Sequence, residues 1–299
     1  MERLDKPSET TGAVLVILSA VLFGTMPLCA RIAYGCGCNP YTVAFGRFAS
    51  GALAAAGVIA LHPSLSFRVS RRELGQLGVL SVLYALTPVL LYLSYQSISS
   101  GLATTLHFTY PLTVMVLGAL LFRKKLRGRQ LLCLGICAAG LLCFYRPGVR
   151  EGSTGMLIAV LSGLTYALYI LLLGKSDLKS LPVLVSTFWI SLLSAGEIGA
   201  FSLVTGKLAF PSAWQGWTAL VALGVFATVM ALALFQKGVF LCGEIKASLL
   251  STFEPLTGVL LGVLLLHETL TFRSIAGIAL ILFSTILLVV KSHRALPAV

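Results

Sequence analysis

The stretch that decides the fold is ASLLSTFEPLTGVLLGVLLLHETLTFR, residues 247–273, because an earlier part of the same chain resembles it. A shift of about 144 residues lays ATTLHFTYPLTVMVLGALLFRKKLRGR, residues 103–129, over it. The triplet Pro-Leu-Thr falls at the same place in both stretches, and Gly118 aligns with Gly262. Self-similarity at a fixed offset indicates an internal repeat.

The repeat extends towards the beginning of each half. A similar shift aligns Gly12 with Gly155. The sequence therefore predicts two related units, residues 1–147 and 148–299, which are joined shortly after Tyr145.

The composition points to lipid as the surrounding solvent. Of 299 residues, 58% are hydrophobic and 11% are charged, which is more apolar surface than one soluble core can bury. Apolar runs of about 20 residues recur along the chain, and each is long enough to cross roughly 30 Å of hydrocarbon. The predicted spans are residues 12–34, 41–61, 77–95, 102–122, 130–145, 156–174, 183–204, 217–236, 247–266 and 275–290. We therefore predict an all-α polytopic membrane protein with about ten transmembrane helices.

The first apolar run is interpreted as a retained span. Its length of about 22 residues exceeds the hydrophobic region of a signal peptide, and a small-residue cleavage site is missing from it.

The positive charge of the chain indicates membrane topology. The formal net charge is +12, but Lys and Arg occur in short clusters between apolar runs, so we expect no nucleic-acid partner. With the N-terminus inside, these residues favour the cytoplasmic side by about three to one. The expectation is a multi-pass protein of the plasma (inner) membrane with both termini cytoplasmic.

Whether each half has an odd or an even number of spans determines how the two halves are oriented in the membrane. Each half holds an odd number of predicted spans, so the second half enters the membrane from the opposite side. The result is a five-plus-five inverted repeat. Alternating access requires such an arrangement, because two related halves rock about a shared midplane site, whereas a channel or an enzyme does not require it.

The last part of the chain resembles a known family. Residues 243–290 combine an alanine-rich entry, a mid-helix proline, small residues, an acidic residue at a helix end and a glycine-bearing final helix. This pattern resembles the last two helices of an EamA repeat in the drug/metabolite transporter superfamily, and the likeness covers both halves. The resemblance implies ten helices in an inverted repeat and the carriage of small organic metabolites, often as export. Lys124 stands where the second half has Glu268, so the resemblance assigns Lys124 no role.

Four ionisable residues lie within the predicted spans, where each costs about 2.5 to 3.5 kcal/mol at mid-helix. They are Arg47, His107, Glu197 and Glu254. Glu254 precedes Pro255, whose missing N–H frees backbone carbonyls in the preceding turn. We predict that Glu254 binds a proton or an ammonium group; the alternative is a protonated carboxyl that supports the bend. His107 is the second candidate for proton coupling, or else a helix-to-helix hydrogen-bond partner.

The repeat brings other polar residues into the same region. Glu254 aligns with Tyr110, and Ser251 aligns with His107. Each half contributes a pair spaced i, i+3, which places both members on one helix face. The four positions are therefore predicted to face a common cavity.

Aromatic residues complete the predicted site. Tyr166 and Tyr169 share a face of the sixth span, the offset maps them to Phe23 and Met26, and Tyr84 lies on the third span. An aromatic wall favours amphipathic or cationic ligands, and ordinary packing is the alternative reading.

Arg47 is a candidate partner for a substrate carboxylate, with an internal pair or snorkelling as alternatives. Glu197 is expected to be structural. The predicted substrate-binding residues are Phe23, Met26, Arg47, Tyr84, His107, Tyr110, Tyr166, Tyr169, Ser251 and Glu254.

The predicted function is secondary transport of a small organic metabolite, namely an amino acid or a related zwitterion or amine, in the direction of export. An organic-cation transporter is the alternative. A membrane-embedded enzyme is the distant alternative, because the histidines are scattered and neither an HExxH motif nor paired aspartates occur.

The expected partners are the small-molecule substrate, the lipid bilayer and a coupling proton. No cofactor and no metal are expected. Gly258 and Gly262 form a weak GxxxG signal, so the chain is expected to be a monomer or a weak homodimer. A disulfide among Cys29, Cys36 and Cys38 stays open at this stage.

Overall fold

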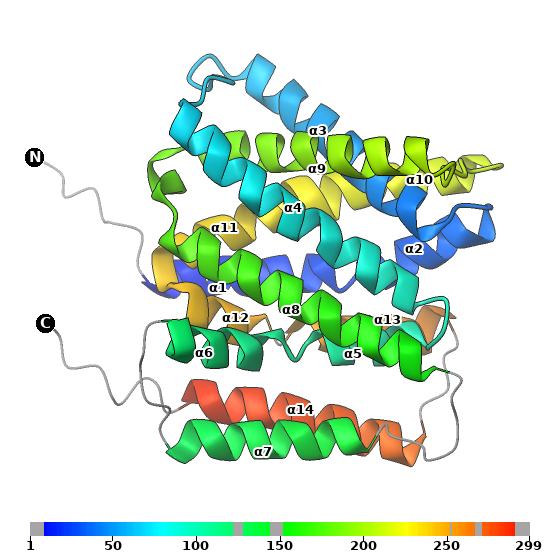
Figure 1. The fold of residues 1–299 in the computed structure, drawn as a ribbon, viewed down its shortest axis with the longest axis vertical. Coiled ribbons are helices and arrows are strands. Elements are labelled where there is room, and N and C mark those ends of the chain that lie inside the picture. The colour runs from blue at the N-terminus through cyan, green and yellow to red at the C-terminus, as the bar shows by residue number, and fades with distance from the viewer. Residues whose placement is uncertain (1–8, 122–127, 144–151, 252, 267–270, 291–299) are drawn as a thin grey trace, which may run out of the picture.

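The structure is a computed structural model that describes residues 9–121, 128–143, 152–251, 253–266 and 271–290. All regular elements in these ranges are helices (Figure 1). Those of the first half are α1 (Glu9–Phe23), α2 (Met26–Gly35), α3 (Pro40–Leu61), α4 (Arg71–Ser94), α5 (Ser100–His107), α6 (Tyr110–Leu121) and α7 (Gly128–Leu142). Those of the second half are α8 (Ser153–Lys175), the 3-10 turn η1 (Asp177–Ser180), α9 (Val183–Val204), α10 (Trp214–Ala222), the π-helix η2 (Leu223–Met230), α11 (Ala231–Cys242), α12 (Glu244–Leu250), α13 (Phe253–Leu266) and α14 (Phe272–Val290).

The helices have the length and surface of membrane spans. Within the described ranges, 7 helical segments are long and apolar enough to cross a bilayer, and shorter apolar segments occupy residues 131–140, 256–265 and 275–284. Large apolar side chains point outwards, such as Leu61 and Val204, which are 84% and 89% exposed. The prediction of an all-α polytopic membrane protein is confirmed.

Four of the predicted spans differ from the helices that form. The spans expected over residues 102–122 and 247–266 are each divided into two helices, α5 with α6 and α12 with α13. The span expected to be continuous over residues 12–34 is interrupted between Phe23 and Met26, because Gly24 and Thr25 form a turn there. The span expected over residues 217–236 extends from Trp214 to Cys242 and contains the π-helix η2.

The packing of the helices repeats across the two halves. α1 packs along α11, and α8 packs along α4. Under the repeat, α1 corresponds to α8 and α4 corresponds to α10–α11, so these are the same contact formed twice. Two further closely packed pairs join equivalent helices: α3 with α9 on one edge of the bundle, and α7 with α14 on the opposite edge (Figure 1).

Two repeat-related glycines show the same symmetry in detail. A Cβ atom on Gly12 would lie 2.8 Å from the Cβ of Leu241, at the end of α11. A Cβ atom on Gly155 would lie 2.8 Å from the Cβ of Ser97, just beyond the end of α4. Each half thus uses a glycine at the same place to let two helices approach closely, as an inverted repeat requires.

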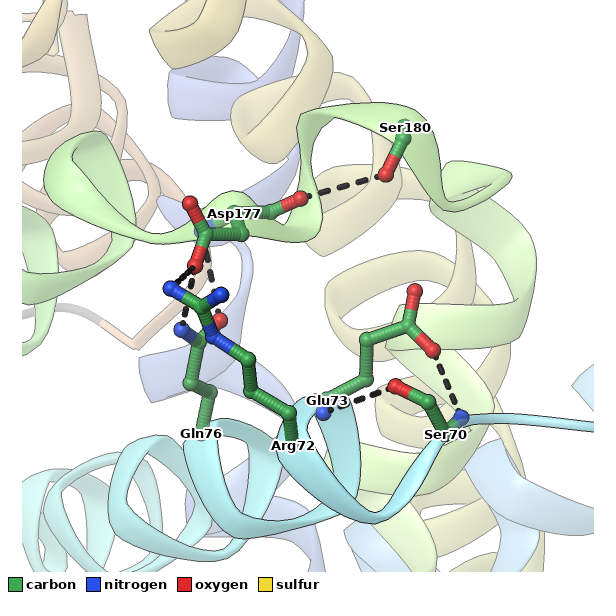
Figure 2. Close-up of polar contacts among 6 residues, drawn as sticks. All are labelled: Ser70, Arg72, Glu73, Gln76, Asp177 and Ser180. Carbon is green, nitrogen blue, oxygen red and sulfur yellow. Dashed lines mark hydrogen bonds and ion pairs between the residues drawn. The ribbon is translucent and has the colours of Figure 1, made fainter.

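One membrane face, called face A, is the face at which α1 and α4 begin and α8 ends. Here Ser70 and Glu73 form a capping box that starts α4 (Figure 2). Arg72 pairs with Asp177 of η1 at 2.6 Å, and the Gln76 amide donates to the same carboxylate at 3.0 Å. These contacts therefore link the first half of the chain to the second half at face A.

Two further ion pairs lie on face A. Lys175 at the end of α8 pairs with Glu244 at 3.4 Å, and Lys246 pairs with Glu9 at 2.6 Å. Both bring α12 against its neighbours, so the helix ends are linked by charge across this face.

The opposite face, face B, is held by hydrogen bonds. The Cys36 carbonyl accepts from the backbone N–H and from the hydroxyl of Ser212, each at 2.9 Å. Asn39 caps α3 and donates to the Lys207 carbonyl at 2.6 Å. The thiols of Cys29, Cys36 and Cys38 are free. Burial raises the pKa of the Cys38 thiol to about 11, which keeps it neutral.

The inverted repeat predicts opposite labelling at two corresponding positions. His62 follows the last residue of α3, and Thr205 follows the last residue of α9; both are exposed. On a background without native cysteines, we expect His62→Cys to react with an impermeant maleimide only from the cytoplasm and Thr205→Cys only from outside. Labelling of both from the same side would contradict the inverted arrangement.

Candidate functional site

Three helices are interrupted inside the bundle, and the interruptions meet. They lie between α1 and α2 at Gly24, between α5 and α6 after His107, and between α12 and α13 after Ser251. The last two are repeat partners. Irregular backbone at membrane depth is stable only where protein buries it or where it lines a cavity. Discontinuous helices of this kind surround the midplane sites of secondary transporters.

A small cavity lies where these interruptions meet. Its wall consists of Phe23, Met26, Arg47, Tyr84, Thr87, Pro88, Leu91, His107, Tyr166 and Glu254. The volume open to the centres of water molecules is about 20 Å³, enough for one or two waters. The cavity therefore has room for water but not for a larger molecule.

Arg47 is buried in the cavity wall and held by three hydrogen bonds. Its Nε donates to the Thr228 hydroxyl at 3.0 Å, and its Nη2 donates to the Tyr84 hydroxyl at 2.8 Å. Nη2 also donates to the Ala227 carbonyl at 3.2 Å. Ala227 and Thr228 belong to η2, and a π-helical turn is frequent at functional sites because it frees backbone groups.

The charge of Arg47 is stabilised by rings and dipoles. The guanidinium lies 5.1 Å from the Phe48 ring centre and 5.5 Å from that of Tyr84, within the range of cation–π attraction. Among the described residues, no carboxylate forms an ion pair with it. Since the side chain is only 2% exposed, it does not snorkel to the surface, and its charge is available to the cavity.

Glu254 faces the same cavity from the first turn of α13. Its side chain is 5% exposed, and its Oε2 atom has no hydrogen-bond partner among the described residues. The break in the first helix packs directly on it, since a Cβ atom on Gly24 would lie 2.8 Å from the Glu254 carbonyl oxygen. A buried carboxylate is costly without a proton or a cation, so Glu254 is suited to bind one of them.

His107 is a hydrogen-bond partner and also lines the cavity. Its Nδ1 lies 2.8 Å from the Ser162 hydroxyl oxygen, and that hydroxyl donates to the Ala159 carbonyl at 2.6 Å. Because the hydroxyl has a single proton, Nδ1–H of His107 must be the donor between the two side chains. The neutral imidazole therefore keeps Nε2 as a proton acceptor.

Tyr166 is the centre of the aromatic wall. Its ring centre lies 4.7 Å from that of Tyr110 and 5.6 Å from that of His107. It also lies 5.9 Å from Tyr169 and 5.8 Å from Phe235. Tyr110, Tyr169 and Ser251 are buried behind the cavity wall, whereas the other predicted residues line it.

Several residues near the cavity were not predicted from the sequence. Thr87, Pro88 and Leu91 of α4 line it, and Phe235 of α11 packs on Tyr166. A signal for Phe235 exists, because the offset that relates Phe23 to Tyr166 also relates Tyr92 to Phe235.

Glu197 lies away from this cavity. Its Oε1 accepts from the Ser81 hydroxyl at 2.6 Å, which joins α9 to α4. The side chain is partly exposed. A structural role fits this contact.

Both halves of the chain match the model of the EamA-like transporter family, at residues 10–146 and 153–290. The chain belongs to the EamA-like transporter family. This EamA-like protein is thus a multi-pass membrane transporter and not an enzyme. The matched ranges agree with the repeat that organises the helix packing.

Curated relatives of this EamA-like transporter are also named as transporters. An uncharacterized transporter of Archaeoglobus fulgidus is 29% identical over 91% of this chain and 93% of its own length. The uncharacterized inner membrane transporter YicL of Salmonella typhimurium is 27% identical over 96% of this chain and 98% of its own. A crystal structure with 16% identity superposes with a TM-score of 0.70 over 95% of this chain and 98% of that one, which shows the fold.

The close contact at His107 gives a stability prediction. A Cβ atom on Gly163 would lie 2.5 Å from the His107 carbonyl oxygen, whereas one on Gly196 of α9 meets nothing within 4 Å. We expect Gly163→Ala to lower the free energy of unfolding by about 1 to 3 kcal/mol, because backbone has to move. Gly196→Ala is the control and should not lower the thermal midpoint in detergent, because its added methyl group meets no neighbour and alanine favours the helix. Equal midpoints for the two variants would contradict the packing at His107.

Proposed function

We propose that this transporter carries a neutral amino acid with an apolar side chain by alternating access. The supporting observation is that Arg47 and Glu254 line one cavity. Among the described residues, Arg47 has no carboxylate partner and Glu254 Oε2 has no hydrogen-bond partner. Arg47 would bind the substrate carboxylate, and Glu254 would bind the ammonium group. Charge-assisted hydrogen bonds of this type are about twice as strong as neutral ones.

The two opposite charges favour a zwitterion over an organic cation. A purely cationic ligand suits Glu254 and the faces of Tyr84 and Tyr166, but it would also meet the buried guanidinium of Arg47. Like charges in a poorly hydrated cavity repel strongly. A ligand that carries its own carboxylate removes this repulsion. The organic-cation transporter therefore stays the alternative.

The rest of the wall suits an apolar side chain. The cavity wall includes the apolar side chains of Phe23, Leu91 and Met26, the last of which carries a thioether. A thioether adapts its shape to irregular partners at small cost. The substrate side chain would rest here while its charged end lies between Arg47 and Glu254.

Substrate entry requires the bundle to open. An amino acid does not fit a space of about 20 Å³, so the side chains around the cavity would have to move apart to admit it. The lining residues Pro88 and Leu91 lie on the face B half of α4, whereas ion pairs close face A. We infer that the next opening occurs towards face B.

Glu254 is also the proposed site of proton coupling. One buried carboxylate holds either a proton or an ammonium group, so binding of the substrate displaces the proton. This competition gives exchange of substrate against protons, and His107 Nε2 is the second proposed acceptor. The proposed direction is export, with the family resemblance as its support.

The remaining proposals concern the placement of the chain. Face A is proposed to be cytoplasmic, with both termini on that side of the plasma (inner) membrane, on the basis of the basic clusters. The repeat units are proposed to be residues 1–147 and 148–299. The chain is proposed to act as a monomer or a weak homodimer.

Analogues of one amino acid test the two charged contacts separately. The probes are L-leucine, isoamylamine, which lacks the carboxylate, and 4-methylpentanoate, which lacks the ammonium group. We expect Glu254→Gln to weaken binding of L-leucine and isoamylamine by about ten- to a hundredfold, and to spare 4-methylpentanoate. Arg47→Gln should weaken L-leucine and 4-methylpentanoate and spare isoamylamine. Affinities are measured by titration of the purified, monodisperse protein.

Glu197→Gln is the matched control, because Glu197 is a membrane carboxyl away from the cavity. It should bind all three probes like the wild type. If Glu254→Gln behaves like Glu197→Gln, the role of Glu254 is structural. If the wild type binds none of the probes, the proposed function is wrong.

A further inference from the structure

The π-helix η2 is in close contact with α3 along its length. Just before η2 begins, the Ser50 hydroxyl oxygen of α3 lies 2.9 Å from the Leu220 carbonyl oxygen. A Cβ atom on Gly224 would overlap the same hydroxyl, and a Cβ atom on Gly51 would lie 2.7 Å from Cγ2 of Thr228. Two glycines thus let α3 and η2 approach so closely that side chains of α3 reach the backbone of η2.

The register of η2 leaves the Ala227 carbonyl to Arg47. In an α-helix, this carbonyl would accept from the N–H of Ala231, four residues further on. The Ala231 N–H instead donates to the Phe226 carbonyl, five residues back, as in a π-helix. The buried Ala227 carbonyl accepts from Nη2 of Arg47 at 3.2 Å. The bond from Arg47 therefore replaces the N–H that the π register directs elsewhere.

The geometry of the guanidinium makes a bound carboxylate compete for this bond. A guanidinium has five N–H groups, one on Nε and two on each Nη. In Arg47, Nε donates to Thr228, and Nη2 donates to both Tyr84 and Ala227. A carboxylate held by two parallel N–H···O bonds pairs either with Nε and Nη2 or with both Nη atoms. Since both arrangements use Nη2, the carboxylate has to displace one of these contacts.

The bond to Ala227 is the one that is displaced most easily. It is the longest of the three, at 3.2 Å compared with 3.0 Å for Thr228 and 2.8 Å for Tyr84. A buried carbonyl requires another donor once Arg47 leaves it. The Ala231 N–H is that donor, because it lies four residues further on in the same helix. Its return to Ala227 would tighten η2 from the π to the α register.

Such a change of register would move α11. One residue of an α-helix corresponds to a rise of about 1.5 Å and a rotation of about 100°, so the residues after η2 would be displaced relative to α10. The Ser19 hydroxyl donates to the Ala231 carbonyl at 2.7 Å, which ties the beginning of α11 to α1. The two helices pack along each other as far as Gly12 and Leu241 near face A. The displacement would therefore pass from the cavity to that face.

We propose that η2 is a switch that responds to the substrate carboxylate: when the carboxylate pairs with Arg47, the Ala227 carbonyl is released and η2 changes from the π to the α register. This inference rests on the proposed function, since it says how binding at Arg47 is passed on to the helices that move. A ligand shifts a conformational equilibrium only if it interacts differently with the two forms. The exchange of acceptors on Arg47 supplies that difference, and a ligand without a carboxylate does not.

Fluorine NMR tests the switch at two lipid-facing positions. On a background without native cysteines, Met230→Cys within η2 and Val221→Cys before it each receive a trifluoromethyl tag; the native side chains are 44% and 52% exposed. Each tagged protein is first titrated with L-leucine. We expect saturating L-leucine and 4-methylpentanoate to shift the resonance of the tag at position 230 and to leave that at position 221 unchanged. Isoamylamine, which lacks the carboxylate, should shift neither, and Arg47→Gln should abolish the response to L-leucine.

The outcomes separate this inference from the proposed function. If L-leucine binds but the tag at position 230 does not respond, or if isoamylamine shifts it equally, the switch is overturned and the proposed function stands. Equal shifts at both positions would indicate movement of the whole helix without a change of register and would overturn the switch as well. A wild type that binds none of the three probes contradicts the proposed function and the switch together.

Discussion

The buried guanidinium of Arg47 is the constraint around which the site is organised. A cation at this depth is stable only if polar groups converge on it, and the structure supplies them from two other helical elements. Thr228 and Ala227 come from the π-helical turn of η2, and Tyr84 comes from α4. The π-helical turn of η2 and the hydroxyl of Tyr84 thus serve the same purpose, which is to hold the guanidinium of Arg47. None of these three groups carries a negative charge, and the carboxyl group of Glu254 faces the same cavity.

The symmetry of the fold explains how unlike residues come to share this cavity. Equivalent helix breaks from the two halves meet at the centre, so each half contributes an interrupted helix to the wall. The first half places His107 there, with Tyr110 behind it, and the second half places Glu254 there, with Ser251 behind it. An inverted repeat fixes the geometry of the two halves, while their sequences are free to diverge into an asymmetric, charged site.

Much of this arrangement was predictable from the sequence, for identifiable reasons. The repeated Pro-Leu-Thr triplet and the alignment of Gly118 with Gly262 predicted two related halves. The length of the apolar runs predicted the membrane spans. Rare ionisable residues in the spans identified Arg47, His107 and Glu254, all of which line the cavity. Helical spacing also selected Tyr110 and Tyr169, but residues one turn apart share a face whether they touch a cavity or the layer behind it.

Other features depend on tertiary contacts that a sequence does not display. The break after Phe23 was missed, although Gly24 marks it, because a glycine inside an apolar run is compatible with a continuous helix. The π-helix η2 carries no local signal, since Arg47 from another helix donates to its Ala227 carbonyl and to its Thr228 hydroxyl. The ion pair between Arg72 and Asp177 joins the first turn of α4 to η1, which are distant in sequence, and neither charge identifies its partner.

The central claim is that the two ends of a zwitterion bind to Arg47 and Glu254 in one cavity, with the ammonium group displacing a proton. Titration calorimetry of L-leucine in buffers of different ionisation enthalpy, at mildly acidic pH, measures the protons released per ligand bound. The account predicts net proton release by the wild type and none by Glu254→Gln. Binding of L-leucine without proton release in the wild type, or with unchanged release in Glu254→Gln, would contradict it.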